Sequence, residues 1–185
     1  MTSAPPIATL REATSPADCA LARALFVEYA RWLGVDLCFQ GFDRELATLP
    51  GAYAPPLGRL LLAGVPGSAH GCIALRRIDT QAMSGNGVNH ESAQANVGEV
   101  KRLYVQPEHR NGGWGRRLAQ ALIVEARAIG YTQLKLDTLE WMGDARKLYA
   151  SLGFHECAPY YDNPLPGVIY MALALQRADG APAGA

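Results

Sequence analysis

Apolar positions follow two periods along this chain, one typical of helices and one typical of strands. Leu21, Leu25 and Tyr29 recur at helical spacing. Ser15 precedes them as a cap with proline at the first helical position, and Gly34 follows them as a stop. Further helices are predicted over 43–49, 113–129 and 144–152. Strands are predicted over 7–12, 59–64, 70–78, 97–105, 133–139 and 168–175.

The order of these elements predicts an α/β fold. Two strand–helix–strand crossovers, together with hairpins, indicate a mixed and partly parallel sheet with helices on its faces. The 185 residues favour one domain over 7–175, with flexible tails at 1–6 and 176–185. Residues 80–96 are rich in Gly, Asn, Ser and Gln and predict a long mobile loop.

Charge and composition exclude several classes of function. Lys+Arg and Asp+Glu both number 17, so no net field disposes the chain to bind nucleic acid. No apolar run approaches the roughly 18 residues of a membrane span, and no secretory signal precedes the domain, so we expect a cytoplasmic protein. The four cysteines form no C-x-x-C pair and are expected to be free, buried thiols. The four histidines show no metal-ligand spacing, so no metal is expected.

The segment most suggestive of chemistry lies between a predicted strand and a predicted helix, at residues 110–117. Gly112, Gly113 and Gly115 let successive N–H groups point into one concavity, and the helix N-terminus adds partial positive charge. With arginines on both sides, this pattern favours a bound pyrophosphate. The glycine spacing matches neither a Walker loop nor the dinucleotide motif. A flexible turn before a helix is the alternative interpretation of the glycines alone.

Two motifs in order resemble the acyl-CoA-binding core of the GNAT acetyltransferase superfamily. The first is Val100-Lys-Arg-Leu-Tyr-Val-Gln-Pro107-x-x-Arg110-x-x-Gly113-x-Gly115, and the second is Ala145-x-x-Leu-Tyr149-x-x-x-Gly153-Phe154. The matching core spans about residues 97–154. The resemblance implies a GNAT-like acyl-CoA N-acyltransferase fold, with a central mixed, mostly antiparallel, twisted sheet and helices on both faces.

The resemblance also implies acetyl-CoA as co-substrate. Backbone groups of Leu103 and Val105 would pair with the pantetheine arm as with a neighbouring strand. A bulge would separate this strand from the one at 133–139. Met142 stands where many family members have an asparagine that binds the cofactor arm. The pyrophosphate would be held by Arg110, Asn111, Gly112, Gly113, Trp114, Gly115 and Arg116.

Catalytic roles follow from the same resemblance. Tyr149 would protonate the departing thiolate; a purely packing role for this aromatic is the alternative. Glu99 is the first candidate for the base that deprotonates the amine, because strand parity places it on the face of Leu103 and Val105. A salt-bridged Glu99 is the alternative, and Asp137 or water could serve as the base instead. An amide of Leu103 or Val105 would stabilise the oxyanion.

We therefore expect an N-acetyltransferase that acts on a primary amine, with a small molecule favoured as acceptor. Residues 39–42 and 160–164 would wall the acceptor side, with Asp162 pairing the amine cation, although they could equally close the core. A protein-acetylating enzyme and a non-catalytic acyl-CoA-binding regulatory module remain alternatives. An edge strand at the C-terminus is the only hint of a homodimer.

Overall fold

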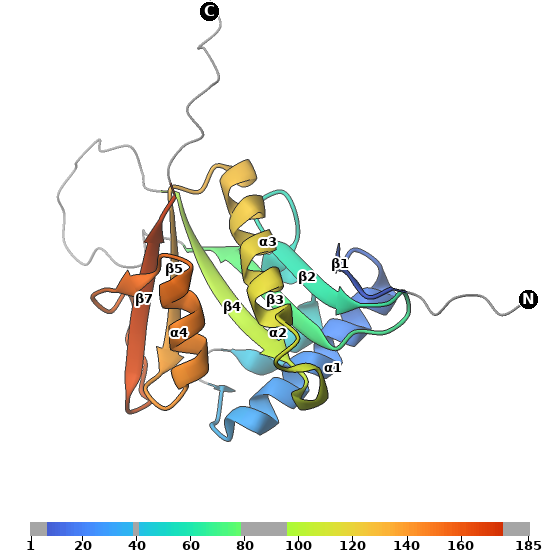
Figure 1. Ribbon diagram of the computed structural model, residues 1–185, viewed down its shortest axis with the longest axis horizontal. Helices are drawn as coiled ribbons and strands as arrows, with labels where there is room; N and C mark the ends of the chain where they lie inside the picture. Colours follow the sequence, from blue (N-terminus) through green and yellow to red (C-terminus); the bar gives the residue numbers. More distant parts are fainter. Residues whose placement is uncertain (1–6, 39–40, 79–95, 176–185) are drawn as a thin grey trace, which may run out of the picture. The chain divides into compact units, whose positions relative to one another are not determined.

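The computed structural model describes residues 7–38, 41–78 and 96–175 (Figure 1). The predicted tails, residues 80–95 of the predicted loop, and Phe39 and Gln40 of the acceptor segment lie outside the described residues. The strands are β1 (Thr9–Glu12), β2 (Arg59–Gly64), β3 (Gly71–Arg77), β4 (Val97–Val105), β5 (Gln133–Leu139), β6 (His155–Glu156) and β7 (Val168–Ala174). The helices are α1 (Pro16–Leu33), α2 (Phe42–Thr48), α3 (Trp114–Ile129) and α4 (Gly143–Ser151), with short 3-10 turns η2 (Gly51–Tyr53) and η4 (Pro107–His109).

The strands form one sheet in the order β1-β2-β3-β4-β5-β7-β6. The pairs β1–β2, β2–β3, β5–β7 and β6–β7 are antiparallel, and β4–β5 is parallel. This arrangement confirms the mixed, mostly antiparallel sheet that the resemblance implied. The described residues divide into two compact units, with the boundary inside β4 after Glu99 and inside α3 after Ile123.

The first unit contains β1–β3, α1, α2 and the second half of β4. Helix α1 begins as predicted, because the Ser15 side chain accepts a hydrogen bond from the Asp18 amide and Gly34 ends the helix with φ of 69°. Its buried side chains, including Phe26, pack on one face of the sheet. That core comprises Ala13, Ala22, Leu25, Phe26, Tyr53, Leu60, Leu62, Cys72, Ala74 and Tyr104.

The opposite face of β2 and β3 is also apolar in this unit. Leu61 and Ile73 alternate with the core residues and are buried on that other face. A side chain at Gly71 would meet the side chain of Leu118, from α3, at 3.3 Å. Helices therefore cover both faces of the sheet here, as expected.

The second unit is built around β5, which pairs with the start of β4 and with all of β7. Leu134 and Leu136 point to one buried face, while Lys135 and Asp137 alternate with them and are half-buried. Strand β6, which the sequence pattern did not predict, adds two residues to the edge of β7. Both of its residues are exposed, so no apolar alternation marks it.

The cysteines are free, as expected, but the expectation that all are buried is wrong. Cys19 and Cys72 are buried and Cys157 is half-buried, whereas Cys38 is exposed. Cys38 lies in the loop after α1, where its amide donates to Asp36 rather than packing into the core.

Candidate active site

The glycine-rich loop of the first unit opens directly into α3. Asn111 and Gly113 both have left-handed backbone conformations, with φ of 65° and 75°. The loop is exposed from Arg110 to Gly113. The first helical bond runs from the Arg117 amide to the Gly113 carbonyl, so the preceding amides have no acceptor within the helix. The geometry therefore supplies exposed N–H donors at a helix N-terminus, which is the arrangement a pyrophosphate requires.

Arg110 packs back onto the end of β4. Its Nε donates to the Val105 carbonyl at 3.0 Å, and its guanidinium lies 4.8 Å from the ring of Trp32 and 5.8 Å from that of Tyr104. These contacts join the loop to the strand predicted to pair with pantetheine. Arg110 remains exposed at the opening of the loop. A second arginine stacks on the helix start. That second residue, Arg117, lies 4.0 Å over the Trp114 ring.

Strand β4 is irregular at Arg102, whose φ is 58°. The register with β5 ends three residues earlier, at the pair Glu99–Lys135. A left-handed residue inside a strand interrupts the alternation of side chains. The parity that placed Glu99 on the face of Leu103 and Val105 assumed a regular strand, so the position of Glu99 has to be taken from its own contacts.

Glu99 is 3% exposed and accepts a hydrogen bond from the Tyr160 hydroxyl at 3.0 Å. Burial, followed by the charges of Glu99 and Asp137, raises the pKa of Tyr160 far above its ordinary value. The Tyr160 hydroxyl is therefore a proton donor throughout the neutral range. Lys135 lies with its Nζ 5.4 Å from the Tyr160 ring. The carboxylate thus has both a fixed donor and a cation in its surroundings.

Asp137, the second candidate base, belongs to the same group of tyrosines. Asn163 donates from Nδ2 to Asp137 at 3.3 Å and to the Tyr161 hydroxyl at 2.9 Å. Burial, followed by the Asp137 charge, raises the pKa of Tyr161 above its ordinary value. The Tyr170 hydroxyl donates to the Tyr161 carbonyl at 2.9 Å. Both candidate bases of the second unit therefore contact the segment 160–163.

The residues of the segment expected to wall the acceptor side differ in exposure. Asp162, expected to pair an amine cation, is exposed, while the neighbouring tyrosines contact Glu99 and Asp137. Residues 160–163 form no helix or strand, and the side chain of Asp162 is exposed between the buried Tyr160 and the half-buried Asn163. The pairing of Asp162 with an amine cation stays a prediction. Alternation along β5 was the available signal for Asp137.

Tyr149 is buried on α4, with 7% of its surface exposed. Its ring lies edge-on to Phe154 at 5.4 Å, and its carbonyl accepts the amides of Leu152 and Phe154. Tyr149 therefore has a packing role at the end of the helix, whether or not it also supplies a proton. Met142, at the start of α4, accepts a hydrogen bond at Sδ from the Thr138 hydroxyl at 3.7 Å.

The two groups of candidate residues divide between the units. The candidate cofactor residues Leu103, Val105 and 110–116 belong to the first unit, and Glu99 and Tyr149 belong to the second. In the part of the chain that the structure describes, no group of three or more His, Cys, Asp or Glu side chains could hold a metal ion. None of the helices within the described ranges has the length and apolarity needed to cross a bilayer.

Comparison with known proteins agrees with the fold and the motifs. The model of the acetyltransferase (GNAT) family matches residues 26–154. An uncharacterized N-acetyltransferase of Schizosaccharomyces pombe is 37% identical over 163 residues, which cover 88% of this chain and 91% of the relative. An IAA acetyltransferase of Azospirillum brasilense is 35% identical over 74% of this chain and 78% of its own length.

A solved structure has the same fold. The acetyltransferase yncA of Salmonella typhimurium, determined with acetyl-CoA, superposes with a TM-score of 0.59 at 22% identity, covering 96% of this chain and 99% of that one. With the family model matching well over half of the chain, the protein belongs to the GNAT acetyltransferase family, and it is an acyltransferase.

Proposed function

We propose that this protein transfers the acetyl group of acetyl-CoA to the primary amine of a small molecule. The observation that carries the proposal is the exposed loop 110–113, whose left-handed Asn111 and Gly113 lead into the N-terminus of α3. Membership of the family supports acetyl-CoA as the donor, and the Salmonella typhimurium neighbour was determined with that molecule. The loop amides and Arg116 would bind the pyrophosphate.

The proposed reaction is a direct transfer. The amine loses a proton to Glu99, either directly or through water, and its nitrogen then attacks the thioester carbonyl carbon. A backbone amide of Leu103 or Val105 stabilises the oxyanion that forms. The carbon–sulfur bond then breaks, and Tyr149 donates its proton to the departing thiolate. The products are the acetylated amine and CoA.

The tyrosine-lined carboxylates support a small cationic acceptor. Tyr160 and Tyr161 present aromatic rings beside Glu99 and Asp137, and this combination attracts an alkylammonium group while excluding bulk water. The burial of Tyr160, which is 3% exposed, favours a small molecule over a protein segment as acceptor. Asp137 is the reserve base in this scheme.

Calorimetric titration of acetyl-CoA tests the donor half of the proposal. Gly113→Asp adds a negative charge to the loop and should abolish binding, and Arg110→Ala should weaken it. Gly130→Asp is the matched control, because Gly130 also has a positive φ, of 95°, and open space around its Cβ position. No binding by a folded wild type, or equal losses in both aspartate variants, would contradict the proposal.

Turnover tests the acceptor half. CoA release is measured against a panel of small primary amines and against lysine-containing peptides. Tyr149→Phe should lower kcat while leaving acetyl-CoA affinity intact. Acetyl-CoA binding without turnover on any acceptor would favour the non-catalytic regulatory module, and turnover restricted to peptides would favour a protein-acetylating enzyme. The single domain, cytoplasmic location and homodimer stay predictions.

A further inference from the structure

Arg102 combines a strained backbone with a buried charge in the middle of β4. Its φ of 58° is a left-handed conformation that residues other than glycine rarely adopt. Its side chain is only 3% exposed. Such strain persists only where the surroundings enforce it, and it concentrates at functional sites. The contacts that hold Arg102 in this conformation therefore bear on the function of the irregular strand.

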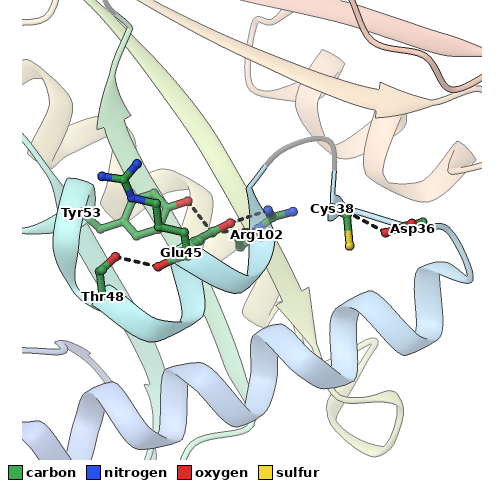
Figure 2. A network of polar contacts seen from close by, with 7 residues as sticks. Asp36, Cys38, Glu45, Thr48, Tyr53 and Arg102 are labelled. Atoms are coloured by element: carbon green, nitrogen blue, oxygen red, sulfur yellow. Dashed lines mark hydrogen bonds and ion pairs between the residues drawn. The ribbon is translucent and has the colours of Figure 1, made fainter.

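The carboxylate of Glu45, on α2, forms a bidentate ion pair with the Arg102 guanidinium. Arg102 donates from Nε to Glu45 Oε1 at 3.0 Å and from Nη2 to Glu45 Oε2 at 2.6 Å. The Tyr53 hydroxyl donates to the same Oε1 at 2.6 Å. Figure 2 shows the Arg102 and Tyr53 side chains converging on the Glu45 carboxylate. We call Arg102, Glu45 and Tyr53 the β4 clamp.

Two further contacts fix the rest of Arg102. Phe42, the first residue of α2, lies with its ring 5.0 Å from the guanidinium carbon. The thiol of Cys72 donates to the Arg102 carbonyl at 3.4 Å, so β3 holds the backbone of the strained residue. Side chain and backbone are thus anchored from different elements, all of them within the first unit.

The electrostatics show a well-matched pair. Burial works to raise the pKa of Glu45, but the hydrogen bonds and charge of Arg102 outweigh it and hold that pKa below its usual value. Burial works to lower the pKa of Arg102, and Glu45 raises it instead. A buried ion pair is nevertheless weak evidence for stability, because apolar residues of similar volume often stabilise a fold as well or better. The pair contributes geometry that apolar residues would not impose.

Helix α2 depends on such an anchor. It has seven residues and none is fully buried, although Phe42 and Leu46 pack against the core of the first unit. A helix this short is marginal on its own hydrogen bonds. The clamp ties α2 to β4, and Arg23 of α1 adds a bond from its Nε to the Leu46 carbonyl at 2.9 Å. The clamp therefore joins α2, whose first residue Phe42 belongs to the expected acceptor wall, to the strand expected to bind the cofactor.

We propose that the β4 clamp positions acetyl-CoA. The two hydrogen bonds from Arg102 to Glu45 hold the strained turn of β4, and this turn presents the backbone of Leu103 and Val105 to the pantetheine arm. The inference rests on the proposed function. It assigns no contact with acetyl-CoA to the clamp itself, which acts through the strand. Loss of the clamp lets β4 relax, and the pantetheine arm loses its partners while the pyrophosphate loop keeps its own.

Two ligands separate this role from general support of the fold. Acetyl-CoA uses both the loop and the strand, whereas 3′-phosphoadenosine 5′-diphosphate, the nucleotide half of CoA, ends at the pyrophosphate. The test variants are Glu45→Gln and the apolar triple variant Glu45→Leu/Arg102→Met/Tyr53→Phe, which removes every polar group of the clamp. Thermal melts establish that each variant is folded, and the triple variant remains testable if Glu45→Gln unfolds.

The triple variant is expected to bind acetyl-CoA about tenfold more weakly, the effect of misplacing strand hydrogen bonds, and to bind the nucleotide half as the wild type does. Arg102→Lys keeps the charge but cannot form the bidentate pair with Glu45, and it should weaken acetyl-CoA binding less than Arg102→Met. The control is Arg11→Met/Asp18→Asn, which removes a half-buried ion pair of 3.0 Å elsewhere in the first unit.

Two results would overturn the inference. Wild-type affinity for acetyl-CoA in a folded triple variant would show that the strand needs no clamp. Parallel weakening of both ligands would show that the clamp supports the unit as a whole. If the wild type binds neither ligand, the proposed function itself fails and this inference fails with it.

Discussion

The hydrogen bond from Tyr160 to Glu99 makes a measurable prediction about stability and catalysis. Tyr160→Phe keeps the ring and deletes only the hydroxyl that donates to a carboxylate at 3.0 Å. Tyr170→Phe is the matched comparison, since its hydroxyl donates to the neutral carbonyl of Tyr161 at 2.9 Å in the same cluster. The two substitutions differ mainly in whether the acceptor carries a charge.

The magnitudes follow from that difference. A hydrogen bond to a charged group contributes about 1.5–3 kcal/mol and one between neutral groups about 0.5–1.5 kcal/mol. For a domain of this size, about 2–4 °C in Tm corresponds to each kcal/mol. We therefore expect Tyr160→Phe to lower Tm by about 3–12 °C and Tyr170→Phe by about 1–6 °C. Urea unfolding provides the free energies directly.

Catalysis provides the second readout. If Glu99 is the base, loss of a donor to its charged form moves the acidic limb of the kcat/KM profile to higher pH in Tyr160→Phe. Tyr170→Phe should leave the profile in place, because its hydroxyl contacts neither carboxylate directly. A smaller loss of stability in Tyr160→Phe than in Tyr170→Phe would refute the assignment of a charged acceptor, and an unmoved profile in Tyr160→Phe would refute Glu99 as the base.

Three further predictions concern pH and packing. Folding lowers the pKa of Glu45 from 4.5, so its carboxylate stabilises the fold above that pH and loses this effect as the pH falls through the pKa of the folded state. In urea unfolding at acidic pH, the free energy of unfolding should therefore fall less steeply with decreasing pH for Glu45→Gln than for the wild type. Burial, followed by the charge of His109, lowers the pKa of His70 from 6.5, so the neutral side chain's contribution to the free energy of unfolding is complete above that pH and declines below it. His70→Gln should make the free energy of unfolding less dependent on pH in this range. A Cβ at Gly58 would overlap the Tyr53 carbonyl carbon, so Gly58→Ala should cost about 3 kcal/mol or more. Gly143→Ala, in open space on α4, should be neutral or stabilising by about 0.5–1 kcal/mol. Similar Tm values for the two alanine variants would contradict both expectations.

Features encoded over a few residues were predictable from the sequence. Ser15 caps α1 and Gly34 ends it, and the strand alternation of Leu134 and Leu136 appears in the fold as expected. The predicted helix at 113–129 begins one residue later, at Trp114, because Gly113 has the positive φ that closes the loop. The two exposed residues of β6 gave no such signal, since their strand exists only through pairing with β7.

The sequence by itself therefore determined the helices and the strands other than β6, because caps, periodicity and glycine-rich turns act over neighbouring residues. Its two motifs, through their resemblance to the family, also implied the mostly antiparallel sheet. The tertiary structure alone decided which charges meet. Tyr160 reaches Glu99 across 61 positions and Arg102 reaches Glu45 across 57, and no local pattern marks either pair. It likewise turned Asp162 outward and placed Asp137 among the tyrosines. Burial enforces such pairings, because a charge removed from water must find its partner wherever the fold brings one.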